Sequence, residues 1–227
     1  MNSVTSSIAV EPEAGDLSRS ARKRAAILEA AHELFLQKGY AGTSMDDVAA
    51  RAAVSKQTVY KNFADKQRLF TEVITSDVGR LEDSTQAQMA AMPDSSDPVA
   101  DLKRFARWHL GEVMQPGRLR LRRMLIGEAE RFPALAQAWY ASGPERSVAE
   151  FAGWFAAWDR RGLLEVPDPM LAGQQFNWLV LSIPLNKAMA YATDEPLFTG
   201  AELDHYADEA VRVFFAAYGV PRRRQPA

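Results

Sequence analysis

The stretch that most constrains the fold carries two helix-start signals a short distance apart, in TSMDDVAARAAVSKQTVYKNF. Ser44 followed three residues later by Asp47 is a capping box, which predicts a helix over about residues 45–52. Ser55 predicts the start of a second helix over about residues 56–63, because its hydroxyl can accept a hydrogen bond from a free backbone N–H. Two short helices joined by such a tight turn have the size of a helix-turn-helix.

The second helix is predicted to have one apolar face and one polar face. Successive residues turn by about 100° around a helix axis, so Val59 and Phe63 share a side and face a core. The opposite side carries an amide, a hydroxyl, a phenol and an ammonium, which are groups that read base edges and bind phosphate oxygens. Gln57 and Thr58 are therefore the predicted base-reading residues. The predicted phosphate contacts are Ser44, Lys56, Tyr60, Lys61 and Lys66.

The residues from about 22 to 70 contain several spaced motifs of one family. An amphipathic helix ends in Lys38-Gly39-Tyr40. The motifs that follow it are Thr43-Ser44, Val54-Ser55-Lys56, Val59-Tyr60, Phe63 and Asp65-Lys66. This pattern resembles the DNA-binding domain of the TetR family of transcriptional regulators. The resemblance implies a homodimer that binds a palindromic operator in double-stranded DNA and that a small effector releases. Ala53 departs from the pattern, since the family often has glycine there, and glycine adopts a positive φ at lower cost.

Charge is unevenly distributed along the chain. Residues 18–70 contain ten basic and five acidic side chains, a net charge of +5, whereas the whole chain has a formal net charge of −2. A basic segment on an acidic body directs one end of the molecule toward phosphate. The alternative is that these charges only decorate solvated helix faces. Their coincidence with the helix-turn-helix pattern favours nucleic-acid binding.

Composition and motifs argue against several other classes of protein. The chain has no cysteine, so it can form neither disulfides nor thiolate metal sites, and its three histidines are far apart in sequence. No apolar run reaches the roughly 18 residues that a membrane span needs. Nucleophile-elbow, phosphate-loop and dinucleotide-binding motifs are also missing. We therefore expect a cytoplasmic protein that is not an enzyme and that uses neither a cofactor nor a metal.

Turn-forming residues predict where the helices of the chain are interrupted. The cluster PDSSDP and the pairs Pro116-Gly117 and Gly143-Pro144 predict breaks between helices, and no strand-like alternation competes with this interpretation. We predict an all-α chain of about nine or ten helices, with a three-helix helix-turn-helix domain and a larger helical domain for ligand binding and dimerisation. The predicted segments are a disordered tail (1–17), the helix-turn-helix domain (18–65), a long connecting helix (66–92), the helical domain (93–220) and a second tail (221–227).

The second domain contains a band of aromatic residues at helical spacing. Helix bundles can hold small molecules in apolar cavities between helices, but aromatic side chains at this spacing also pack as plain core. TetR family members typically bind an inducer in this domain, and PALAQAWYASGPERSVAEFAGWF, residues 133–155, resembles the AefR-like subgroup. The resemblance favours a pocket. The predicted pocket residues are Phe105, Trp108, His109, Glu128, Trp139, Phe151, Trp154, Phe155, Trp158, Asn177 and Trp178.

The last two predicted helices, over residues 170–192 and 201–218, carry more apolar surface than one packed face requires. If they formed only an intramolecular core, a wide apolar stripe would stay uncovered. We therefore predict a homodimer in which two helices from each subunit form a four-helix bundle, as the resemblance implies. The predicted interface residues are Leu181, Leu185, Tyr206, Ala210, Val213, Phe214 and Ala217.

The predicted function is sequence-specific regulation of transcription, by a repressor that a small apolar or aromatic effector releases from its operator. The alternative is a helical carrier of an apolar small molecule without a DNA-binding role. A carrier explains the aromatic band but not the outward polar face of residues 56–63. The residues alone do not distinguish repression from activation, because that outcome depends on where the operator lies relative to a promoter.

Overall fold

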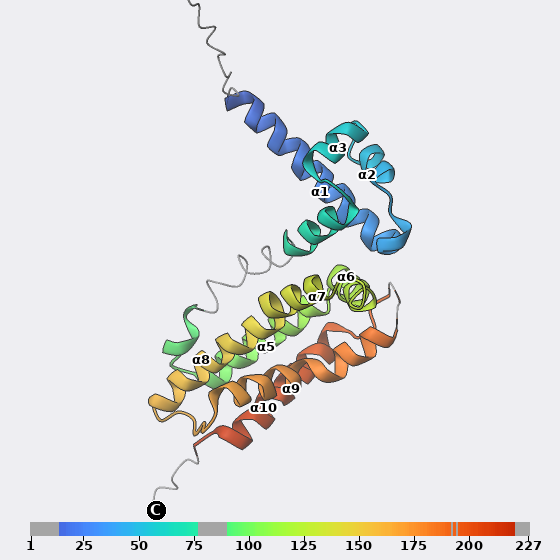
Figure 1. Ribbon diagram of the computed structural model, residues 1–227. Helices are drawn as coiled ribbons and strands as arrows, with labels where there is room; N and C mark the ends of the chain where they lie inside the picture. Colours follow the sequence, from blue (N-terminus) through green and yellow to red (C-terminus); the bar gives the residue numbers. More distant parts are fainter. Residues whose placement is uncertain (1–13, 77–89, 192, 194, 221–227) are drawn as a thin grey trace, which may run out of the picture. The chain divides into compact units, whose positions relative to one another are not determined.

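The computed structural model describes residues 14–76, 90–191, 193 and 195–220 (Figure 1). In these ranges the regular secondary structure is helical, apart from one isolated bridge between Leu164 and Gly219. The predicted all-α class is confirmed. Residue contacts divide the chain into two compact units, Met1–Val73 and Ile74–Ala227. None of the helices in the described ranges has a stretch both long and apolar enough to span a bilayer.

The first unit contains α1 (Ala14–Gly42), α2 (Met45–Arg51), α3 (Lys56–Asn62) and the start of a further helix over residues 66–76. Its core joins aromatic side chains from several of these helices. The Phe35 and Phe70 rings meet edge to face with centroids 5.1 Å apart, and Tyr40 lies 4.9 Å from Phe70. Phe63 is completely buried. The ring contacts of Phe70 therefore hold the helix over residues 66–76 against α1.

The helix α1 begins at Ala14, so its first four residues fall within the segment predicted as a tail (1–17). Near its other end, Gly39 has φ 71° and ψ 175°, a conformation that is essentially restricted to glycine. The Thr43 hydroxyl donates to the Gly39 carbonyl at 2.9 Å and to the Leu34 carbonyl at 3.2 Å. This kink lets the chain leave α1 and enter α2.

The expected connecting helix over residues 66–92 falls largely outside the described residues, because 77–89 are not among them. The two predicted tails also lie mostly outside the described part of the chain. A short 3-10 turn, η1 (Met92–Asp94), precedes the helices of the second unit.

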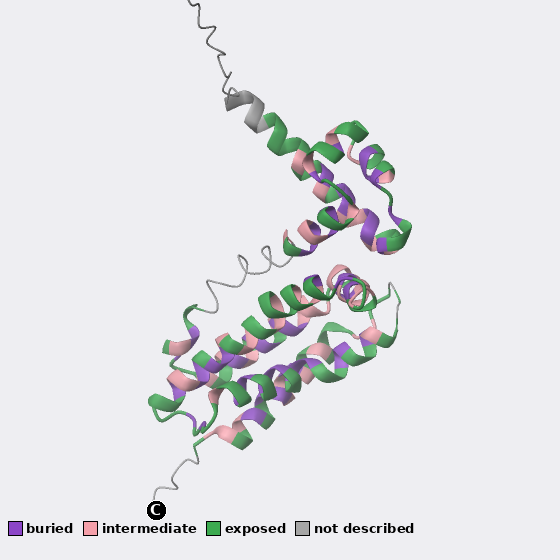
Figure 2. Cartoon of the chain, in the orientation of Figure 1, coloured by how far each residue is buried: buried purple, intermediate pink, exposed green. Residues whose placement is uncertain are grey.

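The second unit is built around four long helices that pack side by side in Figure 1. These are α5 (Pro98–Val113), α8 (Arg146–Arg160), α9 (Pro169–Ala190) and α10 (Gly200–Tyr218). Two shorter helices, α6 (Pro116–Gly127) and α7 (Pro133–Tyr140), lie at one end of this group. Figure 2 shows the buried positions of the long helices turned toward one another.

The break predicted at Gly143-Pro144 is not a break in the backbone. The chain continues from α7 through a π-helical turn, η2 (Ala141–Glu145), directly into α8. The wider π turn accommodates a proline that would clash inside a regular α-helix. The segment therefore stays helical while its side chains change direction.

Aromatic rings from α5, α8, α9 and α10 fill the centre of the second unit. Phe155 and Phe214 have ring centroids 4.4 Å apart, and Phe176 packs against both of them. The Trp158 Nε1 donates to the Met92 carbonyl at 2.9 Å, so this buried indole is fully satisfied. At Gly173 the helices α8 and α9 approach so closely that a Cβ would lie 2.7 Å from the Val148 carbonyl oxygen.

Candidate functional site

The helix α3 presents a polar surface to solvent. Val59 and Phe63 are completely buried, whereas Gln57 and Lys61 are exposed and Tyr60 is 51% exposed. The predicted division of this helix into an inner apolar side and an outer polar side matches these exposures. An amide, a phenol and an ammonium are thus free to approach a surface outside the unit.

Serine caps set the directions of α2 and α3. The Ser44 Oγ accepts a hydrogen bond from the Asp47 backbone N–H at 3.1 Å, and Asp47 accepts in return from Ser44, which completes the predicted capping box. These hydrogen bonds from Ser44 lower the pKa of the Asp47 carboxyl. The Ser55 Oγ accepts from the Thr58 backbone N–H at 3.2 Å and lies 2.8 Å from the Thr58 hydroxyl.

The two lysines that flank α3 have different environments. The Lys56 ammonium is exposed and donates to Asp46 at 2.5 Å, and this contact raises the pKa of Lys56. Lys66 instead turns into its own unit, where it donates to the Tyr40 carbonyl at 2.9 Å and to the Thr43 carbonyl at 2.8 Å. Its ammonium also lies 4.5 Å from the centre of the Tyr40 ring. Lys66 therefore joins the end of α1 to the helix that follows α3.

The turn between α2 and α3 contains a non-glycine residue with positive φ. Ala53 has φ 52°, in the left-handed region that favours glycine. The Val54 N–H donates to the Ala49 carbonyl at 3.1 Å, and the Ala52 N–H donates to the Val48 carbonyl at 2.9 Å. Hydrogen bonds on both sides of Ala53 hold the strained turn in place.

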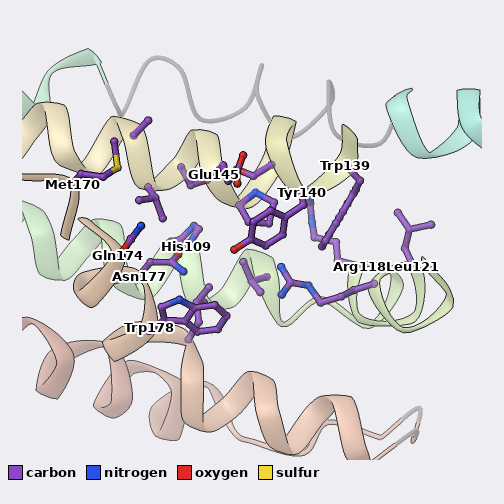
Figure 3. A pocket seen from close by; sticks show the side chains of 18 residues that line it. His109, Arg118, Leu121, Trp139, Tyr140, Glu145, Met170, Gln174, Asn177 and Trp178 are labelled. Atoms are coloured by element: carbon purple, nitrogen blue, oxygen red, sulfur yellow. Dashed lines mark hydrogen bonds between the residues drawn. The ribbon is translucent and has the colours of Figure 1, made fainter. Parts of the chain in front are cut away.

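The second unit contains a cavity of about 510 Å³ between α5, α6, α7, α8 and α9. In Figure 3 the side chains of Tyr140 and Trp178 face the same space, with His109 and Asn177 beside it and Arg118 extending toward it. The lining residues are His109, Val113, Arg118, Leu121, Arg122, Trp139, Tyr140, Gly143, Pro144, Glu145, Ser147, Val148, Ala149, Met170, Gln174, Asn177, Trp178 and Leu181. The wall is thus mostly apolar, with a few polar groups.

His109 is the most deeply buried titratable group on this wall. It is 9% exposed, and its Nε2 has no hydrogen-bond partner among the described residues. The pKa of His109 is lowered from 6.5 to about 4, chiefly by burial, with the Asn177 side chain acting in the opposite direction and the positive charge of Arg122 adding to the decrease. The imidazole is therefore neutral at pH 7.

Two arginines from α6 reach the cavity and differ in their partners. Arg118 forms an ion pair with Glu112 at 3.1 Å. Arg122 stacks on Trp139, with its guanidinium carbon 5.1 Å from the ring centre, and the described residues give it no ion pair. Burial lowers the pKa of Arg122, and Tyr140 opposes this effect.

Only part of the predicted pocket set lines the cavity: His109, Trp139, Asn177 and Trp178. The other aromatic side chains lie elsewhere, because their rings pack against one another between the long helices. Buried in the core are Phe105, Phe151, Trp154, Phe155 and Trp158, and Trp108 packs partly buried against it. Glu128 caps the end of α6. Arg118 and Arg122 were not among the predicted pocket residues, although the basic run RLRLRR could have pointed to them.

The predicted interface residues separate into two groups. Within one chain, Leu181, Leu185, Ala210 and Phe214 are at most 4% exposed, so they belong to the core instead of the outer surface. Tyr206 is half-buried, while Val213 and Ala217 are exposed. Val213 on α10 is 39% exposed, and Leu179 and Ile183 on α9 are 36% and 59% exposed. The exposed apolar residues of α9 are therefore offset by two positions from the predicted ones.

Comparison with known proteins assigns both units to described families. Residues 27–73 match the tetR family of bacterial regulatory proteins, and residues 100–220 match the C-terminal domain of AefR-like transcriptional repressors. The predicted resemblance to both groups is confirmed.

Known structures extend the likeness over most of the chain. A protein from Mesorhizobium loti, assigned to the TetR-family regulators, is 40% identical and has a TM-score of 0.83, with 89% of this chain and 99% of that chain covered. The flavonoid-responsive regulator FrrA is 30% identical with a TM-score of 0.68, covering 89% of this chain and 99% of FrrA.

Curated relatives match over shorter ranges. The transcriptional activator FasR of Mycolicibacterium smegmatis is 33% identical over 73 residues, which are 32% of this chain. The match spans only 33% of the length of FasR.

Proposed function

The chain belongs to the TetR family of transcriptional regulators, and from this premise we propose that it is a homodimeric repressor that a small aromatic molecule releases from a palindromic operator. The observation that carries the proposal is the exposed polar face of α3 over a completely buried Val59 and Phe63. Gln57 and Thr58 read base edges in the major groove, and Tyr60 and Lys61 bind the flanking phosphates.

Of the remaining predicted phosphate contacts, the proposal keeps two and drops one. Ser44 sits at the amino end of α2, where free backbone N–H groups suit a phosphate oxygen. Lys56 can exchange its exposed contact with Asp46 for a phosphate at small cost. Lys66 is withdrawn from the list of phosphate contacts, since two backbone carbonyls already engage its ammonium.

Repression is favoured over activation by the match of the larger unit. The family that covers residues 100–220 is described as AefR-like repressors, whereas the activator FasR matches over only 32% of this chain. A repressor needs only to occupy DNA that a polymerase must use, so no further surface is required.

Dimerisation is supported by the apolar stripe on α9 and α10. Leu179, Ile183 and Val213 are exposed in the single chain, and a two-fold contact would cover the same patch on both subunits. Two copies of α3 related by such an axis can enter successive major grooves, about 34 to 36 Å apart. The operator is then a palindrome.

The cavity in the second unit supports the effector part of the proposal. Its volume of about 510 Å³ lies in the range of small-molecule sites, and Trp139, Tyr140 and Trp178 supply flat apolar walls. The similar protein FrrA is described as flavonoid-responsive, which favours an aromatic effector. A coupling of about 1 to 3 kcal/mol between effector and DNA would change operator affinity by about 5 to 150-fold.

Electrophoretic mobility shift of fragmented genomic DNA tests the proposal. We expect one or a few fragments to be retarded at physiological salt in the presence of excess unrelated DNA. Uniform, salt-sensitive retardation of every fragment would contradict specific regulation. A complete lack of retardation would favour a carrier of small molecules, the alternative that the cavity alone would support.

A further inference from the structure

The cavity wall combines a few polar groups with a large apolar surface, and the proposed function does not explain this combination. Arg122 and His109 both lie on its wall, while most of the remaining wall is aromatic or aliphatic. We propose that the effector is a flat aromatic carboxylic acid, whose carboxylate binds the Arg122 guanidinium and accepts a hydrogen bond from His109. This inference rests on the proposed effector role of the cavity and names the class of molecule that occupies it.

Arg122 supplies a positive charge that the described part of the chain does not neutralise. Its guanidinium stacks on the Trp139 ring, which covers one face without providing a counter-charge. A charge removed from water is costly unless an opposite charge accompanies it. A carboxylate in the cavity would provide that opposite charge through the two parallel hydrogen bonds that guanidinium groups favour.

His109 supplies a second polar group with an unused bonding position. Its Nε2 is buried without a partner, and buried polar atoms are almost always hydrogen-bonded. A neutral imidazole can carry its proton on Nε2 and donate it to a carboxylate oxygen. Arg122 and His109 line the same cavity, so one ligand in it can reach both groups.

The other charged groups of the wall do not remove the preference of the cavity for a carboxylate. Arg118 is already paired with Glu112, so the two together add no net charge. Glu145 lies on an exposed part of the wall, and it does not contribute to the pKa of either Arg122 or His109. The positive end of the cavity is therefore centred on Arg122.

The aromatic residues define the shape of the rest of the ligand. Trp139, Tyr140 and Trp178 line the same cavity as Arg122, and flat rings pack well against such side chains. In Figure 3 the Tyr140 hydroxyl also points toward the cavity, where it can contact a polar substituent. An acid with one or two fused or linked rings fits these walls.

Isothermal titration of the full-length protein with biphenyl-4-carboxylate and biphenyl-4-carboxamide tests the assignment without DNA. The two probes have nearly the same shape and differ in charge. We expect the carboxylate to bind at least about tenfold more tightly than the amide. In Arg122→Met this ratio falls to about one, while the amide binds with an affinity within about threefold of wild type.

Two further variants show whether the preference for the acid depends on the Arg122 guanidinium. Arg122→Lys retains the charge without the planar fork and should keep part of the preference for the acid. Arg120→Met removes a charge from the same helix without touching the cavity wall and should leave the ratio unchanged. Circular dichroism melts show whether each variant is folded.

Three results would overturn the assignment: equal affinities for the two probes in wild type, no binding of the acid at millimolar concentration, or a preference that survives in folded Arg122→Met. These outcomes are independent of DNA binding. If the acid binds with the expected charge preference but leaves the retarded genomic fragments unchanged, the proposed release of the operator by a cavity ligand fails and the ligand class of the cavity stands.

Discussion

At the scale of single residues, the turn between α2 and α3 stores local strain. Ala53 adopts a φ of 52°, which costs an L-residue about 1 to 2 kcal/mol relative to the right-handed region. Ala53 departs from the family pattern, so its position could be singled out from the sequence. Its backbone angle could not, since alanine by itself fits most turn types.

Ala53→Gly should stabilise the helix-turn-helix by about 0.5 to 1 kcal/mol, because relief of the positive φ outweighs the larger entropy that glycine loses on folding. Hydrogen exchange of the α2 and α3 backbone amides measures this change as slower opening. Unchanged or faster exchange would mean that the turn is not strained in solution.

His109 makes the stability of the second unit depend on pH. Its pKa is about 4 in the folded chain and 6.5 in the unfolded chain, so the unfolded state binds a proton first as the pH falls. Its contribution is fully present above pH 6.5 and is lost progressively as the pH falls from 6.5 to about 4. The expected loss is about 3 kcal/mol, taking 1.36 kcal/mol per pKa unit.

Urea unfolding followed by tryptophan fluorescence checks this loss, because all five tryptophans lie between residues 108 and 178. His109→Gln is the control, since carboxylates titrate equally in both proteins and cancel in the difference. A parallel loss of stability in wild type and His109→Gln between pH 6.5 and 4 would mean that His109 is not the cause of the loss.

At the scale of elements, local signals predicted the helix starts well. Ser44 and Ser55 cap α2 and α3 as expected, because a cap depends on residues within one turn of the chain. The cavity could not be predicted in the same way. Whether Trp139 lines a space or Trp158 fills the core depends on how α7 and α8 pack, and the π turn around Pro144 that sets this packing has no simple sequence signal.

The close approach of α8 and α9 gives a test of this packing. Gly173→Ala would place a Cβ 2.7 Å from the Val148 carbonyl oxygen, and separating the two backbones should cost about 1 to 3 kcal/mol. Urea unfolding followed by tryptophan fluorescence measures the loss.

Gly153→Ala on α8 is the matched control. Gly153 is exposed, and nothing lies within 4 Å of an added Cβ. The control should gain up to about 1 kcal/mol from helix propensity. Equal effects of the two substitutions would mean that the helices do not meet closely at Gly173.

At the scale of the whole molecule, the account requires two copies of the chain. The sequence of α9 and α10 shows more apolar surface than one core needs, but Leu181 and Leu185 were predicted to face outward. The structure turns these two inward and leaves Leu179 and Ile183 exposed. A helix that is apolar nearly all round gives no sequence signal for which side faces inward.

Ile183→Glu should weaken the dimer by about 100-fold or more, because the two-fold axis would bury like charges from both subunits near each other. Sedimentation equilibrium measures the dissociation constant. Ile126→Glu is the control, since Ile126 is equally exposed, at 58%, but belongs to α6, which is not one of the two helices of the proposed interface. A dimer equally stable in both variants would place the interface elsewhere.

The central claim, that α3 reads an operator, is tested most directly by comparing Gln57→Ala with Lys61→Ala on the genomic fragment that wild type selects. Lys61→Ala should weaken binding to all sequences and flatten the salt dependence by about one unit per subunit. Gln57→Ala should leave that slope unchanged and relax base preference at one position of each half-site by about 1 to 3 kcal/mol. The claim would be contradicted if Lys61→Ala changed base preference at an unchanged slope, or if neither substitution altered binding.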